Sequence, residues 1–260
     1  MSEKKGISWL LVILCFLSAN IFLIPFPSIV VEVFYGIELL ASFLIPILLW
    51  RNKRTAMPKW ILVFILFSLV VNIHLTRSLL IGLQDNTLLP LVLILSRFCC
   101  QDSFVIGFIV IPFTLSVTFI LIKKGVERIS EVSARFALDT MTTRMTNIDN
   151  KYAKHEITEE ELEVMKKELQ GEIEFFANMD GAAKLISGNA KAILFMTSID
   201  IAGGIVIGYF MQGKTLFEAI EPAILFTTGT VVLYCVPLII ISIASVFCVT
   251  NKVRMYYFCF

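Results

Sequence analysis

The hydrophobic residues of this chain gather in long apolar runs that alternate with short polar stretches. A run of about 20 apolar residues is long enough to cross the hydrocarbon core of a bilayer as a helix. A shorter run at residues 88–95 cannot span, so it predicts a re-entrant or interfacial segment. The pattern predicts an all-α polytopic membrane protein with about six transmembrane helices. The predicted spans are residues 7–24, 28–50, 60–83, 104–122, 192–211 and 222–250.

One long polar stretch, residues 123–190, separates the fourth and fifth predicted spans. Helix-forming residues and a rough apolar stripe predict a helix over residues 126–140. Thr158 and Glu161 have the spacing of a capping box, in which each side chain satisfies a free backbone amide, so a second helix is predicted after Thr158. Residues 147–156 are expected to form the loop between the two helices. The predicted domains are N-terminal transmembrane helices (1–122), a small helical cytoplasmic insert (123–190) and C-terminal transmembrane helices (191–260).

Composition agrees with a membrane protein, and the positions of the charges predict its orientation. Hydrophobic residues make up 57% of the chain and charged residues 17%, mostly in the polar stretch. Cytoplasmic loops of membrane proteins are enriched in lysine and arginine. With both termini in the cytoplasm, the outer loops carry only Arg97 and Lys214. The basic residues on the inner side are then Lys4, Lys5, Arg51, Lys53, Arg54, Lys59, Lys123, Lys124, Lys252 and Arg254.

Motifs for covalent chemistry are absent from the sequence. It contains no nucleotide-binding loop, no catalytic triad signature and no cysteine or histidine spacing typical of a metal site. The six cysteines are expected to be small apolar side chains rather than a disulfide framework. We therefore expect a protein that is not an enzyme and that uses no cofactor and no metal.

A long and specific motif occupies residues 127–139, with the sequence ERISEVSARFALD. Further motifs are ANMDGAAK at residues 177–184, DIAGG at residues 200–204 and NIHLTR at residues 72–77. Together they resemble the FHIPEP family, the large membrane components of flagellar and type III secretion export gates. The resemblance is strong over residues 124–204 and weaker elsewhere.

The resemblance implies a part of the protein-export gate in the bacterial inner membrane, coupling the proton motive force to protein export. Its implied partners are other export-gate membrane subunits, further copies in a homo-oligomeric ring, exported protein substrates and membrane lipid, but not nucleic acid. The family's acidic residue in the GDGL turn of its sixth span aligns with Thr230. The family continues into further spans and a large cytoplasmic domain, whereas this sequence ends at Phe260. We therefore expect a truncated or divergent member.

Four charged residues are candidates for proton or ion coupling. Asp180 occupies the best-matched acidic position of the family near the expected membrane face, where a partly dry carboxylate would have its pKa raised. The alternative for Asp180 is a helix cap. Lys184 belongs to the same motif. Asp200, where the family usually has asparagine, and Arg77 lie inside predicted spans, where a charge pairs, is neutralised or lines a cavity; Arg77 can instead snorkel to an interface.

Charges also alternate in sign along the motif helix, at three- and four-residue spacing. Such a pattern is typical of a solvated face with weak ion pairs between successive turns. The resemblance favours a different interpretation, in which this face contacts a neighbouring subunit of the ring. The residues concerned are Arg128, Glu131, Arg135 and Asp139.

Two other functions remain open from the sequence. Buried charge in the third and fifth spans is also typical of a small ion or solute transporter, although no inverted repeat supports one. A degenerate or structural remnant of a gate is the other alternative, because the acidic residue of the sixth span is absent from the sequence. A pairing of Arg77 with Glu32, Glu38 or Asp200 inside the membrane is a further hypothesis.

Overall fold

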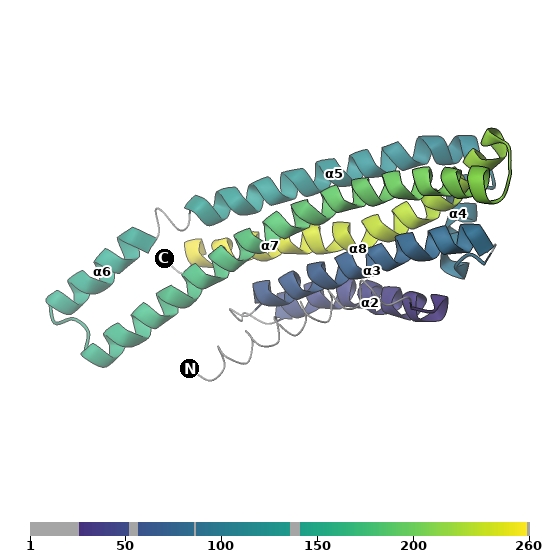
Figure 1. Ribbon diagram of the computed structural model, residues 1–260. Coiled ribbons are helices and arrows are strands. Elements are labelled where there is room, and N and C mark those ends of the chain that lie inside the picture. Colours follow the sequence, from purple (N-terminus) through teal and green to yellow (C-terminus); the bar gives the residue numbers. More distant parts are fainter. Residues whose placement is uncertain (1–25, 52–56, 86, 136–140, 259–260) are drawn as a thin grey trace.

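The computed structural model describes residues 26–51, 57–85, 87–135 and 141–258, which form an elongated bundle of helices (Figure 1). The predicted first span, residues 7–24, lies outside the described residues. In chain order the elements are α2 (Ser28–Arg51), α3 (Met57–Asp85), α4 (Pro90–Cys100), α5 (Phe104–Arg135), α6 (Met141–Ala153), α7 (Glu159–Val206), the π-helical turn η2 (Ile207–Met211) and α8 (Leu216–Phe258).

Five helices of the described residues are long and apolar enough to cross a membrane. They are α2, α3, α5, α7 with η2, and α8, and they contain the second to sixth predicted spans. An apolar run about 20 residues long adopts a helix in lipid because a helix satisfies all of its backbone hydrogen bonds internally. The prediction of an all-α polytopic membrane protein is confirmed.

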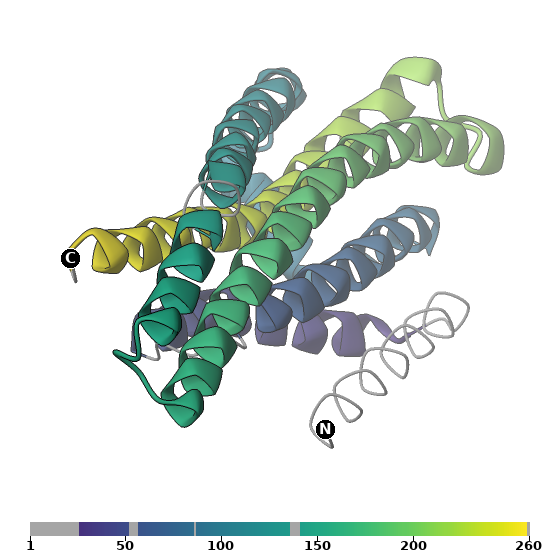
Figure 2. The ribbon, with the colours of Figure 1, turned by 90° about the vertical axis from the view of Figure 1, so that its left-hand side faces the viewer.

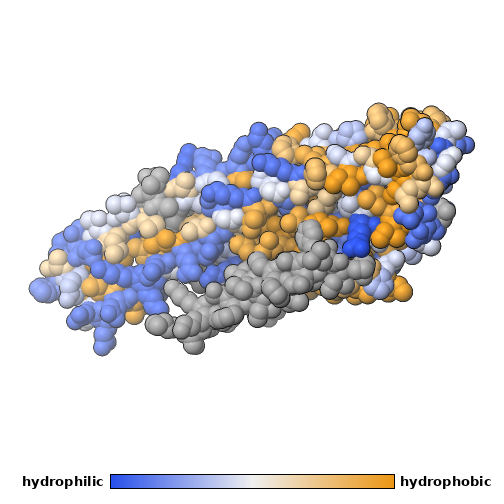
Figure 3. Space-filling model, in the orientation of Figure 1, coloured by the Kyte–Doolittle hydropathy of each residue, from blue (hydrophilic) through white to orange (hydrophobic). Residues whose placement is uncertain are grey.

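The two ends of the bundle differ in polarity. At one end, here called the polar end, α5 and α7 continue beyond their apolar stretches and carry the α6 hairpin (Figure 1). The start of α3 lies at the same end, because Lys59 forms an ion pair of 2.9 Å with Glu174 of α7. Figure 3 shows hydrophilic residues gathered around α6 and hydrophobic residues covering much of the other half of this face. The end that carries α4 and the turn between α7 and α8 is the opposite end.

Helix α8 is the centre of the bundle, because it packs against α2, α3, α4, α5 and α7 (Figure 2). Glycine allows the closest of these approaches. A Cβ atom added at Gly229 would lie 2.6 Å from the backbone oxygen of Val92, so α4 and α8 meet through their backbones there. Short helix-to-helix distances of this kind are typical of membrane bundles, where association depends on close packing of small residues.

The short helix α4 crosses the opposite end of the bundle from α2 to α5. Its Leu91 backbone amide donates a hydrogen bond of 3.2 Å to the Glu32 carboxylate of α2. Its last residue, Cys100, packs beside Gly107 of α5. At 11 residues α4 is too short to span a bilayer, which fits the predicted re-entrant or interfacial segment.

The polar stretch folds differently from the prediction in two respects. The helix predicted over residues 126–140 is not separate: α5 continues without a break from the fourth span to Arg135, with Ile129 and Ser133 buried against the bundle. The loop predicted at residues 147–156 is wrong, because α6 extends to Ala153 and the turn is confined to residues 154–158. The capping box is confirmed, since Thr158 and Glu161 exchange both hydrogen bonds at the start of α7. The predicted domain boundaries thus fall inside continuous helices.

Candidate functional site

A buried carboxylate surrounded by hydroxyl groups lies in the apolar part of the bundle. Asp200 of α7 accepts hydrogen bonds at its Oδ2 atom from Tyr234 at 3.0 Å and from Thr230 at 3.2 Å, both on α8. The Tyr234 hydroxyl is in turn 2.9 Å from the Thr76 hydroxyl of α3. Asp200, Thr230 and Tyr234 are fully buried and Thr76 is almost so. Three helices therefore meet at one carboxyl group; this set is called the Asp200 cluster below.

The hydrogen-bond pattern leaves the cluster room for one more proton. Tyr234 has a single proton, so when it donates to Asp200 the neighbouring hydrogen bond must be donated by Thr76. The Thr230 hydroxyl lies 3.2 Å from Asp200 and 3.0 Å from the carbonyl of Thr227, and its one proton can serve either. Asp200 Oδ1 is buried and has no hydrogen-bond partner among the described residues. A proton held on Oδ2 can be donated to Thr230, whose own proton then stays with Thr227.

A small cavity lies one helical turn beyond Asp200 toward the opposite end. Its volume is about 50 Å³, and Gly204 of α7, Phe226 of α8 and Gly82 of α3 line it. A site of this size admits a few water molecules at most, since one water needs roughly 10–15 Å³ of this measure. Gly204 is four residues after Asp200 and Phe226 is four before Thr230, so the cavity lies about one helical turn from the cluster along both helices.

The second acidic candidate, Asp180, lies in the middle of α7, before the helix enters its apolar stretch. Its carboxylate forms an ion pair of 2.7 Å with Lys184 and accepts a hydrogen bond of 2.6 Å from Ser130 of α5. Ser130 is eight residues beyond Ile122, the last apolar residue of the fourth span, which corresponds to about 12 Å along a helix. Asp180 therefore lies at the polar end, outside the membrane-spanning part.

Both predictions for Asp180 need correction. The hydrogen bonds from Lys184 and Ser130 hold the pKa of Asp180 below its usual range, whereas a raised pKa was expected. The physical reason is that 29% of its side chain stays exposed, so loss of solvation is small beside the two donors. The alternative of a helix cap is also wrong, because α7 runs without interruption from Glu159 to Val206.

The remaining sequence candidates do not join either site. Arg77 is partly buried, and no ion pair in the described part of the chain involves it. Its predicted pairing with Glu38 or Asp200 is wrong, since both Glu38 oxygens and Asp200 Oδ1 lack partners there and Asp200 Oδ2 binds hydroxyl groups. Glu32 accepts instead from the Leu91 backbone amide.

The charged face of the motif helix is exposed. Arg128, Glu131 and Arg135 point away from the bundle, and Arg135 pairs with Glu131 at 2.8 Å. Asp139 lies outside the described residues. Such an exposed i,i+4 pair contributes a few tenths of a kcal/mol. The role of this face in subunit contact stays a prediction.

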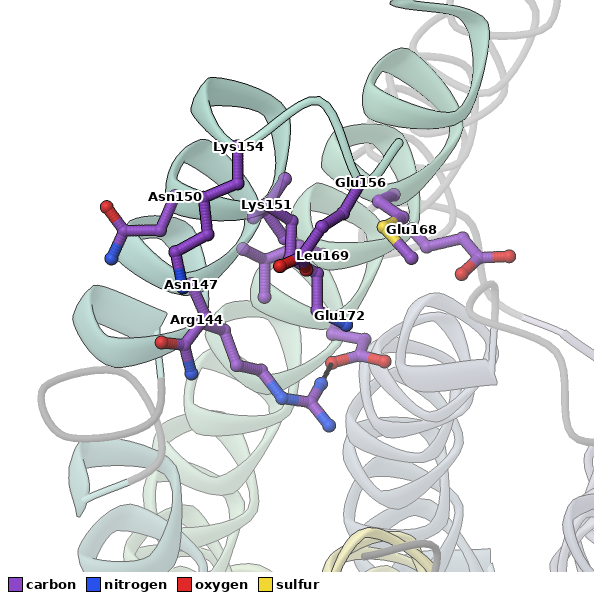
Figure 4. A pocket seen from close by; sticks show the side chains of 11 residues that line it. Arg144, Asn147, Asn150, Lys151, Lys154, Glu156, Glu168, Leu169 and Glu172 are labelled. Carbon is purple, nitrogen blue, oxygen red and sulfur yellow. Dashed lines mark hydrogen bonds and ion pairs between the residues drawn. The ribbon is translucent and has the colours of Figure 1, made fainter. Parts of the chain in front are cut away.

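A groove of about 490 Å³ lies between α6 and α7 at the polar end. Figure 4 shows the Arg144 guanidinium of α6 reaching Glu172 of α7, with which it forms an ion pair of 2.8 Å. A second pair, Lys166 with Asp149 at 2.9 Å, joins the same two helices. The groove is therefore the seam of a helical hairpin, held by charged groups over a partly apolar base that includes Leu169.

Sequence reasoning selected Asp200 but missed the residues that surround it. Tyr234 and Thr230 lie 34 and 30 residues further along the chain, and only the packing of α7 on α8 brings them to the carboxylate. A signal did exist on α3, where Ser68, Asn72 and Thr76 recur every four residues in an apolar run and are all buried. That spacing places them on one face of the helix.

The fold and this site define a polytopic helical membrane protein with an acid group buried between its spans. The chain matches the FHIPEP family over residues 19–255, and it belongs to that family. It is 34% identical to the flagellar biosynthesis protein FlhA of Borreliella burgdorferi over 241 residues, which cover 89% of this chain and 34% of that protein. It is 35% identical to FlhA of Caulobacter vibrioides over 229 residues, covering 86% of this chain and 33% of that protein.

A relative with a different name is also similar. The low calcium response locus protein D of Yersinia pestis is 28% identical over 255 residues, which cover 96% of this chain and 36% of that protein. The chain thus spans about a third of the length of these relatives. No solved structure matches it.

Proposed function

We propose that the chain acts in the membrane part of a flagellar or type III protein-export gate and binds protons at Asp200. Membership of the FHIPEP family and the names of the FlhA relatives support the export function. The proposed role is mechanical and electrostatic, with no covalent chemistry on the exported protein. Basic residues at the polar end support a cytoplasmic location for that end.

The observation that carries the proton-binding role is the contact between Asp200 and Thr230. Thr230 is the position that aligns with the acidic residue of the family's GDGL turn, and its hydroxyl lies 3.2 Å from the Asp200 carboxylate. The carboxyl group missing from α8 is therefore supplied by α7 within the same pocket. This argues against a degenerate remnant, because the chemistry of the pocket is retained although the residue has moved.

The surroundings of Asp200 suit a group that alternates between charged and neutral forms. Carboxyl groups inside a membrane pair with a cation, take up a proton or line a path for ions. No basic side chain lies within ion-pair distance of Asp200 in the described part of the chain. Tyr234 and Thr230 can donate to a carboxylate, and Thr230 can also accept from a carboxylic acid, so both forms find partners. Such adaptability allows the charge of Asp200 to follow the proton supply.

The test is the export of flagellar or type III substrates by cells that depend on this chain, at graded concentrations of a protonophore. Asp200→Asn keeps the shape of the side chain and removes its charge, and we expect export to fall at least tenfold. The matched control is Thr118→Val, which changes a buried hydroxyl on α5 outside the cluster. Unchanged export in Asp200→Asn, with the same protonophore sensitivity as the unmodified chain, would refute the coupling role.

A further inference from the structure

A second carboxyl group, Glu38 of α2, is buried in the bundle and has no part in the site described so far. Its side chain is fully buried, and neither carboxylate oxygen has a hydrogen-bond partner among the described residues. The Ser68 hydroxyl of α3 interacts with the carboxylate without reaching hydrogen-bond geometry. Ser68 also accepts a long hydrogen bond of 3.5 Å from the Asn189 side chain of α7.

A column of polar side chains leads from this place to the Asp200 cluster. It consists of Ser68, Asn72 and Thr76, one helical turn apart on one face of α3. All three are buried, and neither polar atom of the Asn72 side chain has a partner in the described part of the chain. The last member of the column, Thr76, shares a hydrogen bond with Tyr234, which donates to Asp200. Ser68 and Thr76 are eight residues apart, or about 12 Å along the helix.

Unpaired polar atoms along this column point to water as their partner. A buried polar atom that lacks a hydrogen bond costs about 1–3 kcal/mol, and in the hydrocarbon region of a membrane no lipid group can replace the bond. The unpaired atoms include the carboxylate oxygens of Glu38, the side-chain amide of Asn72 and the side-chain oxygen of Asn189. Buried water typically makes about three hydrogen bonds to groups of this kind. A row of water molecules would satisfy them together.

We propose that Glu38 is a second proton-binding group, joined to Asp200 by a chain of water molecules along Ser68, Asn72 and Thr76. The ligand of this site is the proton. Its transfer breaks one O–H bond on the donor carboxyl group and forms one on the acceptor, while each water passes on one proton and receives another. No electron is transferred. The use of this route in export rests on the proposed function, whereas proton exchange between the two groups does not.

Other titratable groups near Glu38 do not offer a competing route. Tyr35 lies three residues before Glu38 on α2 and is the titratable side chain that interacts with the Glu38 carboxylate. His74 is two residues from Asn72, and its ring contacts Phe26 at 5.0 Å between centroids, away from the face of the column. The cavity beside Gly204 lies one helical turn from the Asp200 end of the column, which makes that end the proposed side of entry for protons.

Infrared spectroscopy of the purified full chain in lipid nanodiscs tests the proposal. Protonated carboxyl groups give a carbonyl band that shifts on exchange into heavy water, and the rate of that shift reports access to protons. We expect Glu38→Gln to remove one such band and Asp200→Asn to remove another. Absence of any band that depends on Glu38, across the pH range in which the protein stays folded, would overturn the proposal.

The route itself is tested with changes in the middle of the column. Asn72→Leu should slow exchange of the Glu38 band at least tenfold and leave the Asp200 band unchanged, because Asp200 lies between Asn72 and the proposed side of proton entry at the cavity beside Gly204. Asn72→Ser keeps a polar group and should restore the rate, and Thr118→Val on α5 is the matched control. If Asn72→Leu does not fold, Ser68→Ala replaces it, with Ser68→Thr as its polar counterpart.

An equal rate of exchange of the Glu38 band in Asn72→Leu (or Ser68→Ala) and in the unmodified protein would refute the route. If export is lost in Asp200→Asn but Asn72→Leu does not slow exchange of the Glu38 band, this inference alone is contradicted. If Asn72→Leu slows exchange of the Glu38 band but Asp200→Asn has no effect on export, the proposed function alone is contradicted.

Discussion

Two aspartates on one helix lie in opposite environments. Asp180 and Asp200 are 20 residues apart on α7, about 30 Å along a helix. Asp180 is partly exposed and is paired with Lys184 and Ser130. Asp200 is fully buried, has no cation beside it among the described residues and is held by hydroxyl groups. The first environment favours the charged form of the carboxyl group, and the second provides no cation to hold a charge in place.

Both aspartates lie in motifs that resemble the family, but the side chains that surround them differ. Asp180 belongs to the motif at residues 177–184, and its contacts are an ion pair with Lys184 within α7 and a hydrogen bond from Ser130 that joins α7 to α5. Asp200 lies between apolar spans, its partners are hydroxyl groups, and no cation lies beside it among the described residues, which is why we propose proton binding there. The packing around each aspartate, which the motifs alone do not reveal, is therefore the basis on which we propose Asp200 for proton binding.

One glycine within about a helical turn of each aspartate gives the largest expected contrast. A Cβ atom at Gly204 would lie 2.9 Å from the Ala223 Cβ and 3.3 Å from its Cα, whereas one at Gly181 would meet nothing within 4 Å. Gly204→Leu should therefore destabilise the protein by about 3 kcal/mol through overpacking. Gly181→Leu should be neutral or stabilise it by up to about 1 kcal/mol, because glycine is a poor helix former. Thermal unfolding in detergent measures both, and equal losses would show that α7 and α8 do not meet at Gly204.

Removal of one hydroxyl from each site gives the next contrast. Tyr234→Phe removes one of the two hydroxyl donors of Asp200 and leaves Thr76 without its buried partner Tyr234, which costs about 1–3 kcal/mol. Ser130→Ala removes the corresponding donor from Asp180, where water can replace it, so the loss should be below about 1 kcal/mol. Chemical unfolding of the two variants beside the unmodified protein gives the difference. A larger loss of unfolding free energy in Ser130→Ala than in Tyr234→Phe would contradict the assignment of Asp200 as the buried site and Asp180 as the solvent-exposed site.

Acid should weaken the Asp180 site in a defined direction. Its pKa is held below the usual range by Lys184 and Ser130, so the unfolded chain takes up a proton at higher pH than the folded chain. The stabilisation is complete above the ordinary aspartate range and is lost as the pH falls through the folded-state value. The unfolding temperature of Asp180→Asn should lie below that of the unmodified protein at about pH 7, and the gap should narrow below about pH 4. A gap that widens in acid would contradict the assignment.

The smallest effect is expected for the exposed partner in the Asp180 ion pair. The Lys184 side chain is 73% exposed, so Lys184→Gln should cost at most about 0.5 kcal/mol. Salt screens charges of this kind, and the cost should shrink further in concentrated sodium chloride. Titration of unfolding at low and high salt checks this, and a salt-independent loss would point to a contact other than the ion pair.

The sequence predicts much of the fold because membrane spans are local features. Apolar runs and the Thr158 capping box each follow from neighbouring residues, and the structure confirms both for the described residues. A second capping box, Thr215 with Glu218, has the same sequence pattern and starts α8 six residues before the predicted span. Local signals of this kind are available without any tertiary information.

The site depends on tertiary packing, and there the sequence was less informative. Asp200 was a candidate because a charge stands out in an apolar run. Its partner Tyr234 lies in another such run, and no local pattern links the two residues. The pKa of Asp180 was predicted in the wrong direction because solvent exposure is set by how α5 and α7 pack, although Lys184 stands one turn away in the sequence.

Relocation of the carboxyl group within its pocket tests the central claim most directly. The double variant Asp200→Asn, Thr230→Asp moves the acid from α7 to α8 within one pocket, because the Thr230 hydroxyl and the Asp200 carboxylate are 3.2 Å apart in the unmodified protein. Export in cells that depend on this chain should fall at least tenfold in Asp200→Asn and recover in the double variant. Asp180→Asn, measured beside them, should change export far less than Asp200→Asn. Wild-type export in Asp200→Asn, or a severe loss confined to Asp180→Asn, would contradict the account.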